Sequence, residues 1–386
     1  MIRRRSVGFV LRLLLIGACA VVPPRFISGY PARHYLNDEK SAQISLANEV
    51  RSFVDSGVAT SAFHTGNARF DGEWAFGTFT MAALGLGHVI LHHPELAGVY
   101  APTMEKCAEQ LISSSTNAFG TDAWGAFGFD GLPGGTGHAY LGYSNLALSM
   151  LRLVHPTTRH ARVHDDLTEA LAKRLSDAPH GLFETYPGEA YPADVSMVAA
   201  SIALHDCAVG AAPRAWWKAW KPKYAEWIDS QSGLLFQSGD AATGKPVGPP
   251  RASGTSLGAF ALSFVDDELA KKLHDALARN HTTLLGYGGI REYAPGHEGS
   301  GDIDSGPVVL GVSVSATGFS LSSAKLQGDA ELFTSLYRTA DFWGVPIHRP
   351  NGMRYLSGGP LGNAILLAMT TATKKWQKHC RREGNP

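Results

Sequence analysis

Two kinds of segment alternate along the chain: amphipathic segments that carry charged residues, and apolar segments that lack Asp, Glu, Lys and Arg. In one segment of the first kind, Val163, Leu167, Leu171 and Leu175 recur every four residues with charged residues between them. This spacing predicts a helix with one buried face and one solvated face. Similar patterns occur at 44–53, 104–111, 217–227, 269–277 and 332–340.

The uncharged segments must be buried on nearly every side, because they offer no charged face to water. Their frequent Gly, Ser and Thr residues make them less hydrophobic than lipid favours, and small residues let neighbouring helices pack closely. They therefore predict core helices of a globular protein. The segments are 75–91, 139–151, 196–204, 253–265, 306–324 and 358–373.

Six charged and six uncharged segments in alternation predict an all-α fold, the (α/α)6 toroid. In this fold the uncharged helices form an inner ring and the charged helices form an outer ring around it. Each helical pair of about 50 residues cannot bury its apolar face until its neighbours stack on it. We therefore expect one toroid domain over residues 41–376.

The connections that lead from a charged segment to the next uncharged one are long, whereas the opposite connections are short. Long loops inside a compact domain are usually functional, and these must all emerge at the rim where the inner helices begin. Short alternating pieces that start at Gly181, Gly233, Gly289 and Gly352 predict small β-hairpins there. The long loops are 62–73, 119–137, 180–193, 231–252, 285–305 and 345–358.

The rim loops collect carboxylates, of which Asp71, Glu73, Asp194, Asp302 and Asp304 are candidates for catalysis or binding. We expect Glu73, Asp194 and Asp304 to lie just before uncharged helices, at the positive end of the helix dipole. An Asp in such a place can equally serve as a helix N-cap. Asp302 favours a functional role for Asp304, because two nearby carboxylates push their pKa values apart and yield an acid and a base.

Aromatic and polar side chains in the same loops predict the walls of a substrate pocket. Aromatic faces can hold a sugar or a hydrocarbon equally well. Tyr143 is a further candidate for proton transfer, and the other substrate-binding candidates are Trp74, Trp124, His138, Tyr191, Arg251, Arg291, Tyr293 and Asp302.

The charge balance and the spacing of the histidines bear on two classes of ligand, nucleic acids and metal ions. Lys plus Arg and Asp plus Glu both total 34, so a nucleic-acid partner is not expected. The pairs His88/His92 and His160/His164 stand four residues apart without an H-E-x-x-H motif, which indicates solvated helix ends rather than zinc ligands. We expect no metal and no cofactor.

The N-terminus has the features of an export signal over residues 1–20, with three arginines followed by a short apolar stretch. Ile16-Gly17-Ala18-Cys19 resembles a lipobox that would leave Cys19 lipidated, and Ala18-Cys19-Ala20 also fits ordinary cleavage. Both alternatives place the protein in the periplasm or on the bacterial envelope, with anchoring to the membrane through Cys19 in the first. Residues 21–40 suggest a linker or surface strap, and 377–386 a polar tail.

The remaining cysteines, Cys107, Cys207 and Cys380, are odd in number and widely spaced. This argues against a disulfide framework and against a thiolate metal site.

Several rim motifs, in order along the chain, resemble the linalool dehydratase/isomerase family. They are Gly128-Phe-Asp, Gly142-Tyr-Ser-Asn-Leu, the Tyr186-Pro187 loop, Glu226-Trp-Ile-Asp-Ser-Gln-Ser-Gly and Gly301-Asp-Ile-Asp-Ser-Gly, within a region from about Phe79 to Leu336. The resemblance implies an exported (α/α)6 toroid that performs acid/base chemistry on a tertiary allylic alcohol without a cofactor. It also implies a pocket lined by cysteines, a histidine, an aspartate and tyrosines.

The chain departs from this family at the groups that transfer protons. Tyr143 stands where the histidine is expected, and Thr185 and Asp194 stand where the two cysteines are expected. These changes put the dehydration of a terpene alcohol in doubt. We therefore expect an exported enzyme of the hydro-lyase or isomerase type with another substrate, and the rim residues suggest Asp304 and either Asp194 or Glu73 as acid and base.

In this interpretation Tyr143 and His138 hydrogen-bond to the acid and base, and the substrate is a small molecule. One alternative is a glycoside hydrolase that uses a pair of carboxylates on an oligosaccharide. The other is a non-catalytic, lipid-anchored binding protein of the envelope, in which the acidic residues are helix caps.

Overall fold

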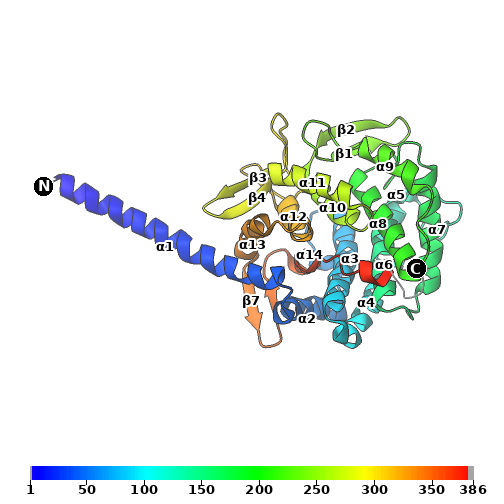
Figure 1. The fold of residues 1–386 in the computed structure, drawn as a ribbon, viewed down its shortest axis with the longest axis horizontal. Helices are drawn as coiled ribbons and strands as arrows, with labels where there is room; N and C mark the ends of the chain where they lie inside the picture. Colours follow the sequence, from blue (N-terminus) through cyan, green and yellow to red (C-terminus); the bar gives the residue numbers. More distant parts are fainter. Residues whose placement is uncertain (1, 381–386) are drawn as a thin grey trace.

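Two concentric rings of helices form the body of the molecule (Figure 1). The structure is a computed structural model and describes residues 2–380. Each inner helix packs against the next, and the last packs against the first, so that the ring closes. The predicted all-α (α/α)6 toroid is thereby confirmed. The inner helices are α3 (Ala68–His92), α6 (Leu141–Val154), α8 (Pro192–Val209), α10 (Ala252–Leu262), α12 (Val314–Leu326) and α14 (Gly359–Thr371).

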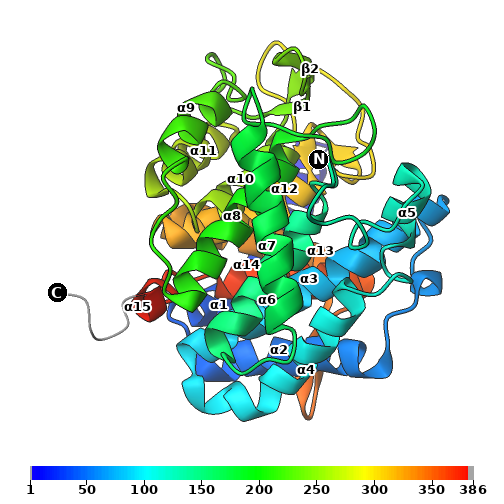
Figure 2. The same ribbon diagram turned by 90° about the vertical axis from the view of Figure 1, so that its right-hand side faces the viewer.

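The outer helices carry the charged residues and bury one face each. In α7, for example, Leu167, Leu171 and Leu175 are buried, while the helix lies on the outside of α6 and α8 (Figures 1 and 2). This is the placement that its four-residue spacing predicts. The outer helices are α2 (Lys40–Ser56), α4 (Ala97–Leu111), α7 (Ala161–Asp177), α9 (Trp217–Ala225), α11 (Asp267–Arg279) and α13 (Ala330–Gly344).

Small residues let the inner helices approach closely. A Cβ atom on Gly142 of α6 would lie 2.6 Å from the backbone nitrogen of Val198 in α8, and one on Gly85 of α3 would lie 2.9 Å from the backbone nitrogen of Ala368 in α14. Helix α3 is long and apolar enough to cross a membrane, but 89% of its most apolar window is buried inside the protein. It is therefore a core helix of the ring.

The histidine pairs do not mark solvated helix ends, so that expectation is wrong. His88, His92, His160 and His164 are all buried. The rings of His88 and His92 each lie 3.2 Å from a backbone carbonyl oxygen of α14. Four-residue spacing reveals that two side chains share a helix face, but not which neighbour covers that face.

The predicted rim hairpins are present. Strand β1 (Phe236–Asp240) pairs with β2 (Lys245–Pro250), and β7 (Pro346–Arg349) pairs with β8 (Gly352–Tyr355), both antiparallel. At Gly181, by contrast, no strand begins, and the loop there has an isolated bridge between Tyr186 and Glu189. A third sheet has the strand order β3-β4-β6-β5. Its strands are β3 (His281–Leu284), β4 (Tyr287–Arg291), β5 (Val308–Val309) and β6 (Val312–Ser313).

The fifth inner helix is shorter than its uncharged segment. Residues from Gly306 onward form β5 and β6 first, and α12 begins only at Val314. Gly306 and Gly311 have φ angles of 64° and 81°, a left-handed conformation that favours turns over helix. An uncharged run of this length contains both a buried hairpin and a buried helix, and charge alone does not separate them.

Residues 21–40 are mostly helical, which differs from the irregular linker or strap expected there. Helix α1 (Ile2–Leu36) runs without interruption and projects from the body, while its last turns lie against α13 (Figure 1). Ala32 and Tyr35 are buried in that contact. Tertiary packing of this kind often decides where a helix persists. The remaining short helices are η1 (Thr60–Ala62), η2 (Pro94–Leu96), α5 (Ala118–Trp124) and α15 (Gln377–Cys380).

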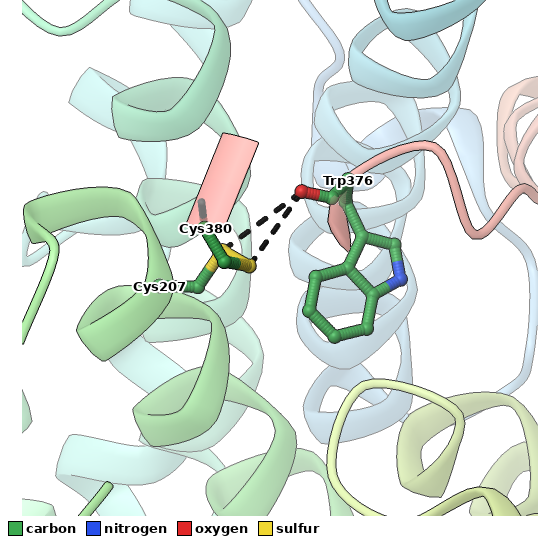
Figure 3. Close-up of a disulfide and its surroundings, with 3 residues drawn as sticks. All are labelled: Cys207, Trp376 and Cys380. Atoms are coloured by element: carbon green, nitrogen blue, oxygen red, sulfur yellow. Dashed lines mark hydrogen bonds between the residues drawn. A yellow bond between two sulfur atoms is a disulfide. The ribbon is translucent and has the colours of Figure 1, made fainter. Parts of the chain in front are cut away.

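The C-terminal segment is tied to the inner ring by a disulfide, so the expectation that these cysteines stay unpaired is wrong. Cys380 of α15 is bonded to Cys207 of α8, and both sulfur atoms lie near the carbonyl oxygen of Trp376 (Figure 3). The two cysteines are 173 residues apart. Only closure of the ring brings the segment after α14 next to α8. Residues 381–386 of the predicted tail lie outside the described residues.

Candidate active site

A pocket of about 580 Å³ opens at the rim where the inner helices begin. The N-terminal parts of all six inner helices contribute to it, so its position agrees with the rim that the loop lengths indicate. These contributions are Glu73 and Trp74 of α3, Tyr143 of α6, Asp194 of α8, Ser253 of α10, Ser315 of α12 and Leu361 of α14.

Asp194 is held by two hydroxyl groups. The Tyr143 hydroxyl donates to Oδ1 over 2.7 Å, and the Thr185 hydroxyl donates to Oδ2 over 2.8 Å. Burial raises the pKa of Asp194, and these two hydrogen bonds oppose that effect. Burial and the neighbouring carboxylate also raise the pKa of Tyr143, which keeps the phenol protonated as a donor. Asp194 lies in the first turn of α8 but is bonded to side chains, which is not the arrangement of a helix cap.

Glu73 lies one turn into α3, where it accepts two hydrogen bonds on Oε1. The Tyr186 hydroxyl donates over 2.6 Å and Nε of Arg69 donates over 3.2 Å. The Arg69 guanidinium also lies 3.8 Å from the centre of the Tyr186 ring. Burial raises the pKa of Glu73; these two donors oppose the shift, and the charge of Asp194 adds to it. Glu73 and Asp194 are therefore electrostatic neighbours.

Arg251, which also lines the pocket, binds two carboxylates, those of Glu292 and Asp302. Its buried guanidinium donates from Nε to Glu292 over 2.7 Å and from both Nη atoms to Asp302, with Nη2 2.9 Å from Oδ1. Glu292, which is fully buried, also accepts a 2.6 Å bond from the Ser253 hydroxyl. Burial opposes the shift, but Arg251 and the backbone N–H of Ser305 lower the pKa of Asp302 to about 2. Asp302 therefore carries a fixed negative charge.

Asp304 lies two residues further along the same loop and shows the opposite shift. Its side chain is exposed to solvent, but it belongs to the lining of the pocket and is flanked by the pocket walls. This burial, together with the charges of Asp302, Asp194 and Glu73, raises the pKa of Asp304 to about 7. The expectation that Asp304 precedes an inner helix directly is wrong, because α12 begins ten residues later at Val314. Burial and the neighbouring negative charges raise the pKa of Asp304, whereas the positive end of a helix dipole would have lowered it.

The deeper part of the pocket is apolar. Met81, Leu257, Phe319 and Ile365 line it, and each lies further along its inner helix than the polar residues of the rim. Nearer the rim, Trp74, Tyr191, Gln237, Arg69 and Glu189 provide aromatic faces and hydrogen-bonding groups. The pocket thus offers polar recognition at its mouth and space for hydrocarbon at its base.

Some predicted site residues lie outside the pocket. Asp71 accepts hydrogen bonds from the backbone and hydroxyl of Thr65, at 2.9 and 2.8 Å, which lower its pKa and fix the start of α3. The Trp124 ring stacks on His138 at 4.3 Å, and its Nε1 donates to the carbonyl oxygen of Thr185. This pair supports the loop that carries Thr185.

Arg291 and Tyr293 also lie outside the pocket lining. Arg291 is exposed on β4, and the Tyr293 hydroxyl donates to the carbonyl oxygen of Ser300. The Tyr293 backbone forms an isolated bridge with Arg251, and its ring centre lies 5.7 Å from the Arg251 guanidinium. Glu292, between Arg291 and Tyr293, is the residue that accepts a hydrogen bond from Arg251.

The sequence analysis missed Arg69, Gln237 and Glu292. Arg69 could have been found, because it stands four residues before Glu73 and helical residues at this spacing interact. Glu292 could have been found only from the alternation of the extended chain that continues from β4. We see no sequence signal for Gln237, which comes close to the site through the fold of the β1–β2 hairpin.

Within residues 2–380, the group of side chains with donor atoms close enough to hold a metal ion is His164, Asp165 and His205. It lies on α7 and α8, away from the pocket.

Neither a protein-family model nor a curated protein matches the sequence. Among solved structures, a GH76 alpha-mannanase from Bacteroides thetaiotaomicron is similar, with 11% sequence identity and a TM-score of 0.47 over 78% of this chain and 86% of that chain. At this level the similarity carries no inference about activity. The toroid implied by the resemblance to linalool dehydratase/isomerase is present, and membership of that family stays a prediction.

Proposed function

We propose that the rim pocket performs general acid/base catalysis, and that its substrate is a glycoside that it hydrolyses. The observation that carries the proposal is the group of carboxyls in one pocket whose pKa values are pushed apart, Asp302 to about 2 and Asp304 to about 7. Such a separation leaves Asp304 able to hold a proton at a pH at which Asp302 is ionised, so Asp304 can act as a proton donor.

Asp304 is the general acid of this proposal, since its pKa of about 7 keeps a large protonated fraction near neutral pH. It gives its proton to the oxygen of the leaving group. Asp194 is the base or the nucleophile, because the Tyr143 and Thr185 hydroxyls stabilise its ionised form. The separation between two such carboxyls decides between attack by the carboxylate and attack by a water molecule.

The polar mouth of the pocket supports a sugar substrate. Trp74 and Tyr191 present aromatic surface, while Gln237 and Arg69 present donors that match hydroxyl groups. A site built from such groups selects substrates that satisfy them, because an unpaired polar group in a pocket weakens binding. We therefore favour an oligosaccharide over a simple hydrocarbon.

The apolar base of the pocket favours a second candidate function, the dehydration or isomerisation of a hydrophobic alcohol. Met81, Phe319 and Ile365 would contact the hydrocarbon part. Asp304 would protonate the hydroxyl group so that water leaves, and Asp194 would take a proton from the adjacent carbon. The resemblance to linalool dehydratase/isomerase supports this candidate, and the replacement of its cysteines and histidine by Thr185, Asp194 and Tyr143 counts against a shared substrate.

One experiment tests both candidates. The purified protein is incubated with a panel of oligosaccharides and a panel of terpene alcohols, and products are identified by mass spectrometry. Replacement of Asp304 by Asn should reduce kcat about 100- to 10,000-fold, because a general acid contributes that much. The matched control is Asp71→Asn, which removes a rim carboxylate that lies outside the pocket and should leave kcat unchanged.

Asp304→Asn should also fold, since a raised pKa means that the ionised form destabilises the native state above about pH 4, and the neutral amide lacks that charge. Circular dichroism and the Tm verify this. Near-normal activity of Asp304→Asn would exclude Asp304 as the acid. Inactivity of the wild-type protein on both panels would favour the non-catalytic binding protein.

The bacterial envelope is the location that we propose. Disulfides such as Cys207–Cys380 persist in oxidising compartments. Helix α1 exposes Ile16, Phe26 and Ile27, and it leaves the body beside β3, β4 and α13 (Figure 1). These features suit a segment that directs export or remains at a membrane. The oxidation state of the disulfide in cells is the measurement that tests this location.

A further inference from the structure

A cluster of metal-ligating side chains lies at the end of the toroid opposite the pocket. His164 and Asp165 lie in the first turns of α7, and His205 lies near the C-terminal end of α8. One ligand atom from each lies within 4.8 Å of the others. His205 is eleven residues beyond Asp194, and at 1.5 Å per helical residue the cluster lies about 16 Å from the carboxylate of the pocket.

The hydrogen bonds of His164 leave one ring nitrogen free to bind a metal. Its Nε2 lies 2.9 Å from the Ser149 hydroxyl. That hydroxyl has one proton, which it gives to a backbone carbonyl oxygen of Asn145 or Ser201, at 2.8 and 2.9 Å. With the Ser149 proton assigned to one of these carbonyl oxygens, His164 donates to Ser149 from Nε2, and Nδ1 carries a lone pair. In the described part of the chain this buried Nδ1 has no partner, and the residue is only 1% exposed.

His205 is oriented in the manner of a metal ligand. Its Nδ1 lies 3.1 Å from Oδ1 of Asp206, and Arg214 holds that carboxylate with bonds of 2.9 and 3.0 Å. A carboxylate that accepts the Nδ1 proton leaves Nε2 for the ion, which is the usual support of ligating histidines. Nε2 faces Oδ1 of Asp165 at 2.9 Å.

Asp165 completes the cluster and connects it to solvent. Its side chain is 48% exposed, whereas those of the two histidines are nearly inaccessible. Arg152 is its other partner, at 3.5 Å. Asp165, Asp206 and the nearby Glu169 carry three negative charges against the two positive charges of Arg152 and Arg214, so the surroundings favour a cation.

We propose that His164 Nδ1, His205 Nε2 and the Asp165 carboxylate bind one divalent transition-metal ion of the zinc class. Imidazole nitrogens with a carboxylate oxygen form a ligand set that suits zinc, with bonds of about 2.0–2.2 Å and a water molecule in the fourth position. Rotation of the partly exposed Asp165 side chain brings the donors together. The ion joins the outer helix α7 to the inner helix α8, so its role is structural and independent of the pocket.

The test measures zinc binding by the full-length protein after dialysis against a chelator. Titration with Zn²⁺ by calorimetry should give one site per chain, and a saturating concentration should raise the Tm by a few degrees, because a ligand that binds only the folded state stabilises it. Asp165→Asn should weaken binding at least tenfold. The matched control is Asp166→Asn, which removes the adjacent and more exposed carboxylate and should bind zinc like the wild type.

Asp165→Asn should retain the wild-type fold by circular dichroism because Asp165 is partly exposed, and His164→Gln provides a second variant that should lose the site. Catalytic activity of Asp165→Asn should equal that of the wild type, which distinguishes this site from the pocket. Equal zinc affinity in Asp165→Asn, Asp166→Asn and the wild type, or no binding to the wild type, would overturn the proposal.

Discussion

At the scale of single residues, the pocket shows how one loop gives two carboxyl groups opposite properties. Asp302 is hydrogen-bonded to Arg251 and stays ionised, while at Asp304 burial and the charges of Asp302, Asp194 and Glu73 outweigh the opposing charge of Arg251. The sequence Gly301-Asp-Ile-Asp-Ser-Gly indicated that the two acids interact. It could not indicate which would receive the guanidinium, because Arg251 comes from a loop about fifty residues earlier.

The proposed role of Asp304 as general acid predicts a pH dependence. Because Asp304 must be protonated to act as the acid, kcat/KM should fall as the pH rises through about 7. Asp302→Asn should shift this fall to lower pH, since it removes a negative charge next to Asp304 and frees the positive charge of Arg251. The measurement is the pH profile of both proteins.

Asp177→Asn, which changes an exposed carboxylate at the end of α7, is the control and should keep the wild-type profile. A profile that does not move in Asp302→Asn would show that Asp304 does not set the alkaline limit.

At the scale of helices, the tight contacts of the inner ring depend on glycine at particular places. Gly142 of α6 packs directly against the backbone of α8, so any side chain at this position would clash with α8. Gly318 lies inside α12, and nothing is within 4 Å of the position that its Cβ would occupy. The two residues therefore serve different purposes, although the sequence presents both simply as glycines in uncharged segments.

The two glycines should respond oppositely to alanine. Gly142→Ala should reduce the free energy of unfolding by about 1–3 kcal/mol, because the Cβ atom forces α6 and α8 apart. Gly318→Ala should increase it by about 0.5–1 kcal/mol, because alanine restricts the unfolded chain and favours helix. Denaturant unfolding of the two variants checks this. A loss of stability in Gly318→Ala would mean that α12 packs more tightly than described.

Helix periodicity predicted the helices well, because residues on a buried face are apolar, residues on a solvated face are charged, and both recur with the period of the helix. It failed where different structures share one composition, as at Gly306, where the hairpin of β5 and β6 precedes α12. For the pocket it found Glu73, Asp194, Asp302 and Asp304, since these stand next to inner helices or near one another. The placement of Trp124 and His138 could not be predicted, because it depends on how a loop folds back over Thr185.

At the scale of the whole molecule, ring closure brings together segments that are far apart in the sequence. The Cys207–Cys380 disulfide is the covalent example, and its span of 173 residues explains why spacing did not reveal it. The link holds α15 against α8 and so fastens the chain that follows α14.

This disulfide gives a prediction about both location and stability. Protein recovered from the periplasm should contain it, and reduction should lower the free energy of unfolding by about 2–4 kcal/mol, a typical value for a cross-link of this kind. Cys380→Ser should show the lower stability from the start and no further response to reductant. Mass spectrometry and thermal unfolding with and without reductant measure this. A fully reduced Cys207 in the exported protein would argue against an oxidising location.

The contact between α3 and α14 has a consequence for how the protein is made. Helix α3 is among the first parts to leave the ribosome, and the inner helix that covers one of its sides is the last. Until then α3, whose composition resembles that of a membrane span, exposes apolar surface that invites aggregation. We therefore expect a chain truncated before α14 to expose part of α3 and to be cleaved faster than the full-length protein in limited proteolysis.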